Sequence, residues 1–155
     1  MNINTYELYL DEETRHCTIR EKESHVYKEE TYQQPAAVSR MMEELFALTE
    51  RADEYLYLLA FNTKLRLLGI FEVGHGTGNA CLADPRGIYI RAVCIGASNI
   101  ILVHNHPSGC TKPSMEDMRL TTLVKDAGEL LGIHLLDHII VGSEGCASLH
   151  EMELV

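Results

Sequence analysis

The 155-residue sequence lacks any apolar run close to the roughly 18 residues that a membrane-spanning helix requires. Its five cysteines are odd in number and include no C-x-x-C pair, and no signal peptide precedes them. These absences argue against a transmembrane protein and against a disulfide framework. We therefore expect a soluble protein of the reducing cytoplasm that makes no membrane contact.

Basic residues are also scarce. The chain carries 13 lysines and arginines against 23 aspartates and glutamates, which gives a net charge of -10. Its basic residues are scattered singly, whereas the phosphate contacts that dominate nucleic-acid affinity need clustered positive charge. Direct nucleic-acid binding is therefore disfavoured, although a local basic patch could still form in the fold.

Internal repeats and low-complexity segments are absent as well. With 46% hydrophobic residues, a chain of this length can bury a sizeable core within one domain. Residues 1–34 contain patches of alternating polar and apolar residues between 3 and 31, which predict two or three short strands. We expect this strand-rich segment to be part of the same domain as residues 35–155.

Helical and strand patterns alternate along the rest of the chain. Helices are predicted at 35–52, 84–96 and 115–131, and strands at 54–61, 65–73, 99–103 and 133–141. A turn at 62–64 predicts that the first two of these strands form a hairpin. The glycine-rich stretch 74–78 lacks the lysine of a phosphate loop, so we predict a plain loop there. The alternation predicts a layered α/β domain.

The most informative stretch runs from His104 to Asp117 and reads HNHPSGCTKPSMED. It follows a predicted strand, and side chains two positions apart on a strand share a face, so His104 and His106 should point the same way. Proline, serine and glycine then predict a loop, and Ser114-x-x-Asp117 has the form of a helix start. Two histidines and an aspartate could meet there, as in a hydrolytic zinc site.

Each of these residues also has a purely structural explanation. A histidine at a strand end can be an ordinary polar residue, and Ser114 with Asp117 can cap the helix, which stabilises it by about 1 kcal/mol. Capping does not account for two histidines directed at the same loop. A metal site is therefore the better explanation of the whole set.

The spacing His-x-His, seven residues, Ser, two residues, Asp resembles the JAMM motif of the JAB/MPN metalloproteases. The longer strings HNHPSG, PS-x-x-D and LGIHLLDHIIVG resemble the RadC family of bacterial proteins, over about residues 54–142. The resemblance implies a mixed sheet flanked by helices, in a single-domain α-β-α architecture of the cytidine-deaminase-like kind. Longer RadC-like proteins resemble a helix-hairpin-helix module joined to this domain, and we expect a short form without that module.

The resemblance also implies roles for individual residues. His104, His106 and Asp117 would hold Zn²⁺, and a glutamate at a helix-to-strand junction would act as general base. Glu54 matches that description, because an aromatic residue and an apolar run follow it; without the resemblance it would be an ordinary residue at a strand edge. Ser114 would donate a hydrogen bond to the developing oxyanion, unless its hydroxyl is committed to the helix cap.

The implied activity is that of a zinc-dependent metallohydrolase that cleaves a peptide or isopeptide bond of a peptide or protein substrate by attack of a metal-bound water. An alternative is a non-catalytic or weakly catalytic RadC-like module that acts in DNA repair or mobile-element processing through protein partners. Glu54 argues against that alternative, because a scaffold needs no base. A zinc deaminase is disfavoured because its H-x-E and P-C-x-x-C signature is absent.

Three residues near the motif leave alternatives open. The thiol of Cys110 could approach the metal, or it could be a free surface cysteine. Asp137 and His138 could orient a metal ligand from outside the site, since ligating histidines usually donate their second N–H to an acceptor. The same two residues could equally satisfy their own hydrogen bonds within a buried strand.

Overall fold

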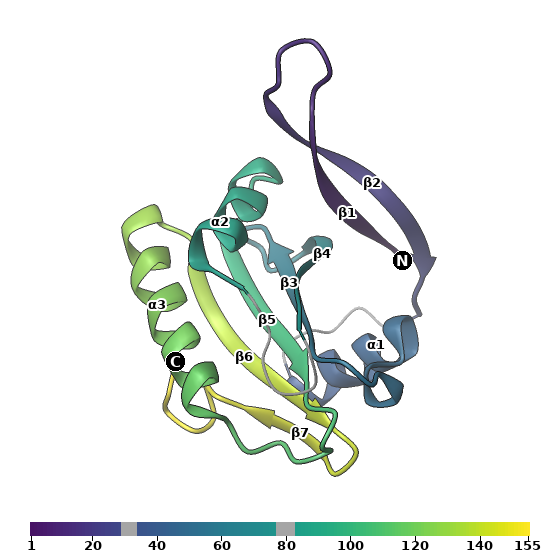
Figure 1. Ribbon diagram of the computed structural model, residues 1–155, viewed down its shortest axis with the longest axis vertical. Helices are drawn as coiled ribbons and strands as arrows, with labels where there is room; N and C mark the ends of the chain where they lie inside the picture. The colour runs from purple at the N-terminus through teal and green to yellow at the C-terminus, as the bar shows by residue number, and fades with distance from the viewer. Residues whose placement is uncertain (29–33, 77–82) are drawn as a thin grey trace.

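The computed structural model describes residues 1–28, 34–76 and 83–155, and within them it shows a seven-stranded mixed sheet in the order β2-β1-β4-β3-β5-β6-β7 (Figure 1). The strands are β1 (Asn2–Leu10), β2 (Cys17–Val26), β3 (Tyr55–Phe61), β4 (Leu67–His75), β5 (Asn99–Asn105), β6 (His134–Gly142) and β7 (Gly145–Ser148). Strands β1 and β4 pair in parallel, as do β5 and β6, and the other neighbours are antiparallel.

Helices lie on both faces of the sheet (Figure 1). They are α1 (Pro35–Phe46), α2 (Pro85–Cys94) and α3 (Met115–Leu131), with a 3₁₀ helix, η1 (Leu48–Glu50), after α1. The described part of the chain contains no helix that is both long and apolar enough to cross a membrane. The fold is therefore the predicted layered α/β domain.

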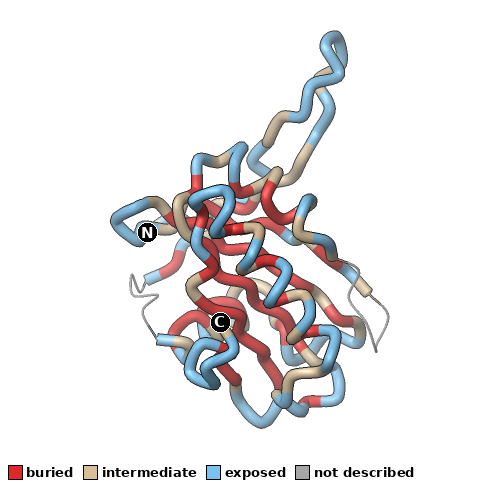
Figure 2. Tube along the Cα trace, turned by 90° about the vertical axis from the view of Figure 1, so that its left-hand side faces the viewer, coloured by how far each residue is buried: buried red, intermediate tan, exposed pale blue. Residues whose placement is uncertain are grey.

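The central strands are buried on both faces, and successive side chains serve different cores. On β3, Leu56 and Leu58 pack with residues of α2 and α3, whereas Tyr57 and Leu59 pack with residues of α1. Figure 2 shows the buried residues concentrated in these strands. Such strands read as almost continuous apolar runs, and this is why the sequence pattern identified β3, β5 and β6.

The first two strands form a long hairpin that projects from the sheet (Figure 1). Strand β1 joins the sheet through parallel pairing with β4, at Thr5 and Ile70. The outer strand β2 is largely exposed, as is the tip of the hairpin (Figure 2). Residues 1–28 thus contain two long strands in place of two or three short ones, and the predicted positions 29–31 lie outside the described residues.

The predicted end of the first helix was wrong. Helix α1 ends at Phe46 and not near residue 52, because Ala47 adopts the left-handed conformation (φ 49°). The carboxylate of Glu43 then accepts bonds from the backbone N–H and the hydroxyl of Thr49 (2.9 and 2.6 Å), which fixes the turn into η1. An alanine at this position gives no signal of a helix end.

The predicted loop at 74–78 was also partly wrong. Gly74 and His75 belong to β4, whose partner across the ladder is β3, and residues 77–78 lie outside the described part of the chain. At the other end, β4 begins at Leu67 and not at Leu65, because Leu65 has a positive φ (56°) within the turn. Strand β7 had no counterpart in the sequence prediction.

Candidate metal centre

The candidate centre lies where the chain leaves β5 and returns as α3. His104 is in β5, His106 is the first residue after it, and Asp117 is the third residue of α3. The loop between them turns at Gly109, which has a positive φ (83°). A Cβ at this position would collide with the side chain of Ser143, so the loop requires glycine there.

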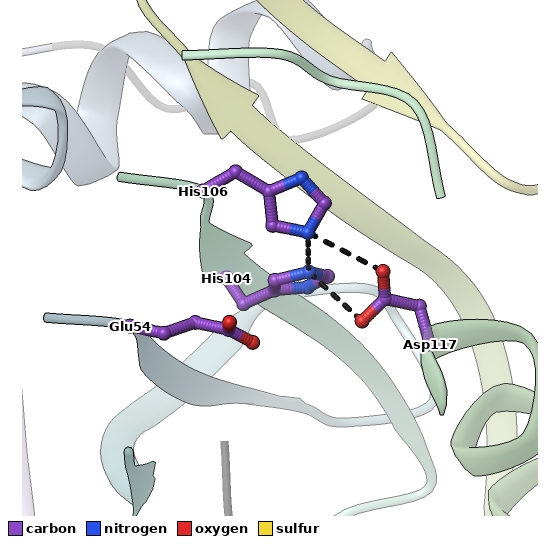
Figure 3. Close-up of side chains that lie close together, drawn as sticks. All are labelled: Glu54, His104, His106 and Asp117. Carbon is purple, nitrogen blue, oxygen red and sulfur yellow. Dashed lines mark hydrogen bonds and ion pairs between the residues drawn. The ribbon is translucent and has the colours of Figure 1, made fainter. Parts of the chain in front are cut away.

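The predicted ligands converge on one point (Figure 3). The Nε2 atoms of His104 and His106 lie 2.9 Å apart. His104 Nε2 is 3.1 Å from one carboxylate oxygen of Asp117, and His106 Nε2 is 3.3 Å from the other. Three ligand atoms at the corners of a tetrahedron around zinc would lie roughly 3.3 to 3.4 Å from one another, given metal–ligand bonds of 2.0–2.1 Å. The spacing therefore fits one shared ion.

Hydrogen bonds at the far side of each ring direct Nε2 toward that point. His106 Nδ1 donates to the backbone carbonyl of Cys110 (2.7 Å). His104 Nδ1 lies 2.8 Å from Nε2 of His138, whose Nδ1 lies 2.7 Å from the hydroxyl of Thr121. Thr121 in turn bonds the carbonyl of Asp117 (2.6 Å).

The direction of this chain of bonds follows from its last member. A carbonyl only accepts, so the single hydroxyl proton of Thr121 goes to Asp117 and the Thr121 oxygen accepts from His138 Nδ1–H. His138 Nε2 is then an acceptor, and His104 donates to it from Nδ1. The Nε2 lone pair of His104 remains available for a metal ion.

Asp117 is part of the capping box of α3 and a candidate ligand at once. Its carboxylate accepts from the backbone N–H of Ser114 (2.7 Å), and its own N–H donates to the Ser114 hydroxyl (3.1 Å), which completes a capping box. The structural explanation and the metal explanation of these two residues are therefore compatible. The first turn of α3 fixes the orientation of the carboxylate.

Glu54 reaches the same centre from the neighbouring strand. The antiparallel ladder pairs Leu56 with His104, so Glu54, two residues before Leu56, comes next to His106, two residues after His104. Its carboxylate lies with the donor atoms of the other three side chains inside a span of 4.8 Å. In Figure 3 it points toward them without a dashed contact, and it is 7% exposed.

The charged groups of the four side chains interact strongly. Burial raises the pKa of Glu54, and the hydrogen bond with Asp117 raises the pKa of His106. Burial alone would raise the pKa of Asp117 too, but the bonds from the two histidines hold it well below its usual range. Complete burial depresses the pKa of His138, so that ring is neutral, as its acceptor role requires.

A cavity of about 320 Å³ adjoins the cluster. The hydroxyl of Ser114 lines it and accepts from Asp117 N–H, so its own proton is free to be donated. The capping role and the predicted oxyanion role therefore do not compete. The apolar lining comes from β3, the start of α2 and the outer side of α3, and consists of Leu56, Ala83, Pro85, Leu120 and Leu123.

The structure distinguishes the roles that the sequence left open for Asp137, His138 and Cys110. Parallel pairing places His138 opposite Leu102 and Asp137 opposite Ile101, so these two neighbours point to different faces. His138 contacts the candidate ligand His104, whereas Asp137 accepts bonds from the Ser148 hydroxyl and from the backbone N–H groups of His138 and His150. The Cys110 residue is exposed and contributes its carbonyl, not its thiol.

Sequence reasoning missed Thr121 and Asn105. Thr121 is invisible in the motif because its role depends on a bond to His138, a residue 17 positions away. Asn105 stands between the two histidines, and its amide bonds the backbone on both sides of Glu54. Its position on the strand face opposite to the histidines could have indicated a separate role.

A family model described as RadC-like JAB domain matches residues 32–154. The chain is 42% identical over 115 residues to a UPF0758 protein of Alkaliphilus metalliredigens (strain QYMF), covering 74% of this chain and 48% of the relative. It is 39% identical over 115 residues to a UPF0758 protein of Clostridium tetani (strain Massachusetts / E88), covering 74% and 49%. The chain thus spans about half the length of these relatives.

Proposed function

The chain belongs to the RadC-like JAB domain family, and on this basis we propose that it is a zinc-dependent metallohydrolase of the JAMM type that cleaves a peptide or isopeptide bond. One observation carries the proposal: a glutamate just before β3, two histidines at the end of β5 and an aspartate of α3 present their ligand atoms within 4.8 Å of one another. Capping and strand packing do not require the glutamate in that set.

The donor set favours zinc. Two imidazole nitrogens and one carboxylate are ligands that zinc accepts, and catalytic zinc sites keep three protein ligands with an open fourth position, whereas structural sites are closed by four. His104, His106 and Asp117 would supply the three ligands. When bound, the ion would lower the pKa of a coordinated water to about 7 and polarise the substrate carbonyl.

Glu54 is suited to accept and return a proton. Its carboxylate lies within 4.8 Å of the ligand atoms of His104, His106 and Asp117, close enough to contact a water bound at the same point. Burial raises the pKa of Glu54 above the usual value of a glutamate, which makes its carboxylate a better proton acceptor. We assign it the transfer of a proton from the attacking water to the leaving amine.

Ser114 would stabilise negative charge on the substrate carbonyl. Its hydroxyl proton is free, and helix α3 holds the oxygen in place through Asp117 N–H (3.1 Å). Removing one such preorganised donor typically costs about 100-fold or more in kcat. The adjoining apolar cavity is large enough to hold a side chain next to the scissile bond.

The test compares wild type with E54Q, H106A and the control E72Q, which changes an exposed glutamate of β4. We expect wild type, E54Q and E72Q to bind one zinc ion per chain, and H106A to lose most of it. E54Q should lose about 100-fold or more of the hydrolysis of a proteome-derived peptide mixture, read by mass spectrometry. Full hydrolysis by E54Q, or none by wild type, would contradict the proposal.

A further inference from the structure

The side chain of Asn105 lies where β3 and β5 separate to make room for the site. The backbone ladder between these strands ends at the pair Leu56 and His104. At the next position, Tyr55 N–H donates to Asn105 Oδ1 (2.8 Å), and Asn105 Nδ2 donates to the carbonyl of Asp53 (3.0 Å). The amide of Asn105 thus takes the place of the next backbone pair.

These two bonds flank a single residue, Glu54. Asp53 and Tyr55 are its chain neighbours, so the amide clamps the peptide groups on either side of it. The carbonyl of Glu54 itself accepts from Gly76 N–H (2.9 Å) at the end of β4. Three hydrogen bonds therefore fix the backbone from which the Glu54 side chain leaves, while its carboxylate remains directed at the metal centre (Figure 3).

An asparagine suits this position better than an aspartate does. Its carboxamide offers one acceptor and one donor with the spacing of a peptide group, which a carboxylate cannot reproduce because it only accepts. Asn105 is 1% exposed, so both bonds are shielded from water. The metal ligands do not depend on it, because they are held by His138, by the Cys110 carbonyl and by Ser114 N–H.

We propose that Asn105 is the positioning residue of the base: it sets the distance between Glu54 and the metal centre without touching either the ion or the substrate. The inference rests on the proposed function. Because Asn105 stands between His104 and His106, one three-residue segment places two ligands and the base. A misplacement of about 1 Å in a catalytic group can cost about 100-fold in rate.

The test uses N105A, E54Q and a matched control, N99A. Asn99 is on the same strand and donates from its amide to the carbonyl of Asn62 (3.2 Å), far from Glu54 in the ladder. Each protein is loaded with cobalt(II), and its visible absorption is followed against pH. N105A should bind one cobalt ion, and its pH midpoint should move toward that of E54Q by at least half the difference between E54Q and wild type.

The cobalt measurement decides the inference without a substrate. The N99A midpoint should equal that of wild type. If N105A titrates like wild type, if it loses the metal, or if E54Q itself titrates like wild type, Asn105 does not position a base. Should N105A fail to fold, N105D replaces it: aspartate keeps the acceptor for Tyr55 N–H but loses the donor to Asp53, and the same shift is expected.

Hydrolysis supplies the second readout. With zinc, N105A should cleave the peptide mixture about 100-fold more slowly at saturation, with little change in KM, while N99A cleaves like wild type. A loss confined to KM would overturn the positioning role. If wild type cleaves nothing, the proposed hydrolase function fails, and the cobalt midpoint still decides whether Asn105 sets the position of Glu54.

Discussion

Single hydrogen bonds determine which atom of each histidine faces the metal centre. The spacing of the motif predicted that His104, His106 and Asp117 would meet, because strand geometry and a helix start are local properties. It could not predict the partner of His104, because His138 is 34 residues away in the chain and reaches it only through the parallel register of β5 and β6. The proposed role of Glu54 came from family resemblance, since no local pattern distinguished this glutamate.

Thr121 offers a test of the bonds behind His104. We expect T121V to lower zinc affinity by about 10- to 100-fold, because the nearly isosteric valine removes the acceptor that fixes the His138 tautomer. The matched control is T122V, since the Thr122 hydroxyl bonds the carbonyl of Met118 (2.9 Å) on the exposed side of the same helix. Chelator competition measures the zinc affinities of both variants. Equal affinities would show that the hydrogen bonds through His138 and Thr121 do not orient His104.

At the scale of the elements, the sequence located the three main helices but misplaced the end of α1. The predicted helix continued past Phe46 because the residues that follow contain no glycine or proline up to residue 52. The helix stops where Ala47 takes a left-handed conformation, which costs an L-residue with a side chain about 1–2 kcal/mol. The bonds between Glu43 and Thr49 and the burial of Leu48, not helix propensity, accompany that boundary.

The strain at Ala47 predicts that a glycine will stabilise the protein at position 47 and destabilise it elsewhere in α1. A47G should raise the free energy of unfolding by up to about 1 kcal/mol, because glycine adopts this conformation without a Cβ clash. A36G, an exposed position in the first turn of α1, should lower it by about 0.5–1 kcal/mol. Urea unfolding of both variants measures the two changes, and destabilisation by A47G would show that Ala47 is not strained.

For the whole molecule, the layered α/β fold was predictable because strands buried on both faces leave continuous apolar runs. The order of the strands was not, since it depends on pairings such as β1 with β4, which join residues 65 positions apart at Thr5 and Ile70. The exposed outer strand β2 and the short β7 carry little hydrophobic pattern. The sequence therefore predicted only short strands in the region of β2, and β7 became visible only in the structure.

The pH dependence of stability should differ between metal-free and zinc-loaded protein. In the metal-free protein, the raised pKa of His106 means that its pairing with Asp117 stabilises the fold fully below about pH 6.5 and less as pH rises through the raised pKa. Zinc binds His106 only when the ring has lost its proton. The stabilisation of the fold by zinc therefore grows as pH rises through the pKa of His106.

The gap between the melting temperatures with zinc and with a chelator should therefore widen from about pH 5.5 to 8. Differential scanning fluorimetry at matched ionic strength measures both series. H106Q is the control, and its gap should stay small at every pH. A gap in wild type that does not change with pH would mean that zinc binding and the His106 proton are not linked.

The double use of Asp117 affects how such a site can be lost over time. A lineage with no further need for the metal could replace Glu54 at little cost to folding, but replacing Asp117 would also remove one of the two bonds of the capping box of α3. Genetic drift should therefore erase the base before the carboxylate ligand. Among descendants of this chain, a retained Asp117 could be explained by its role in folding alone. A retained Glu54 would be the better sign of an active enzyme.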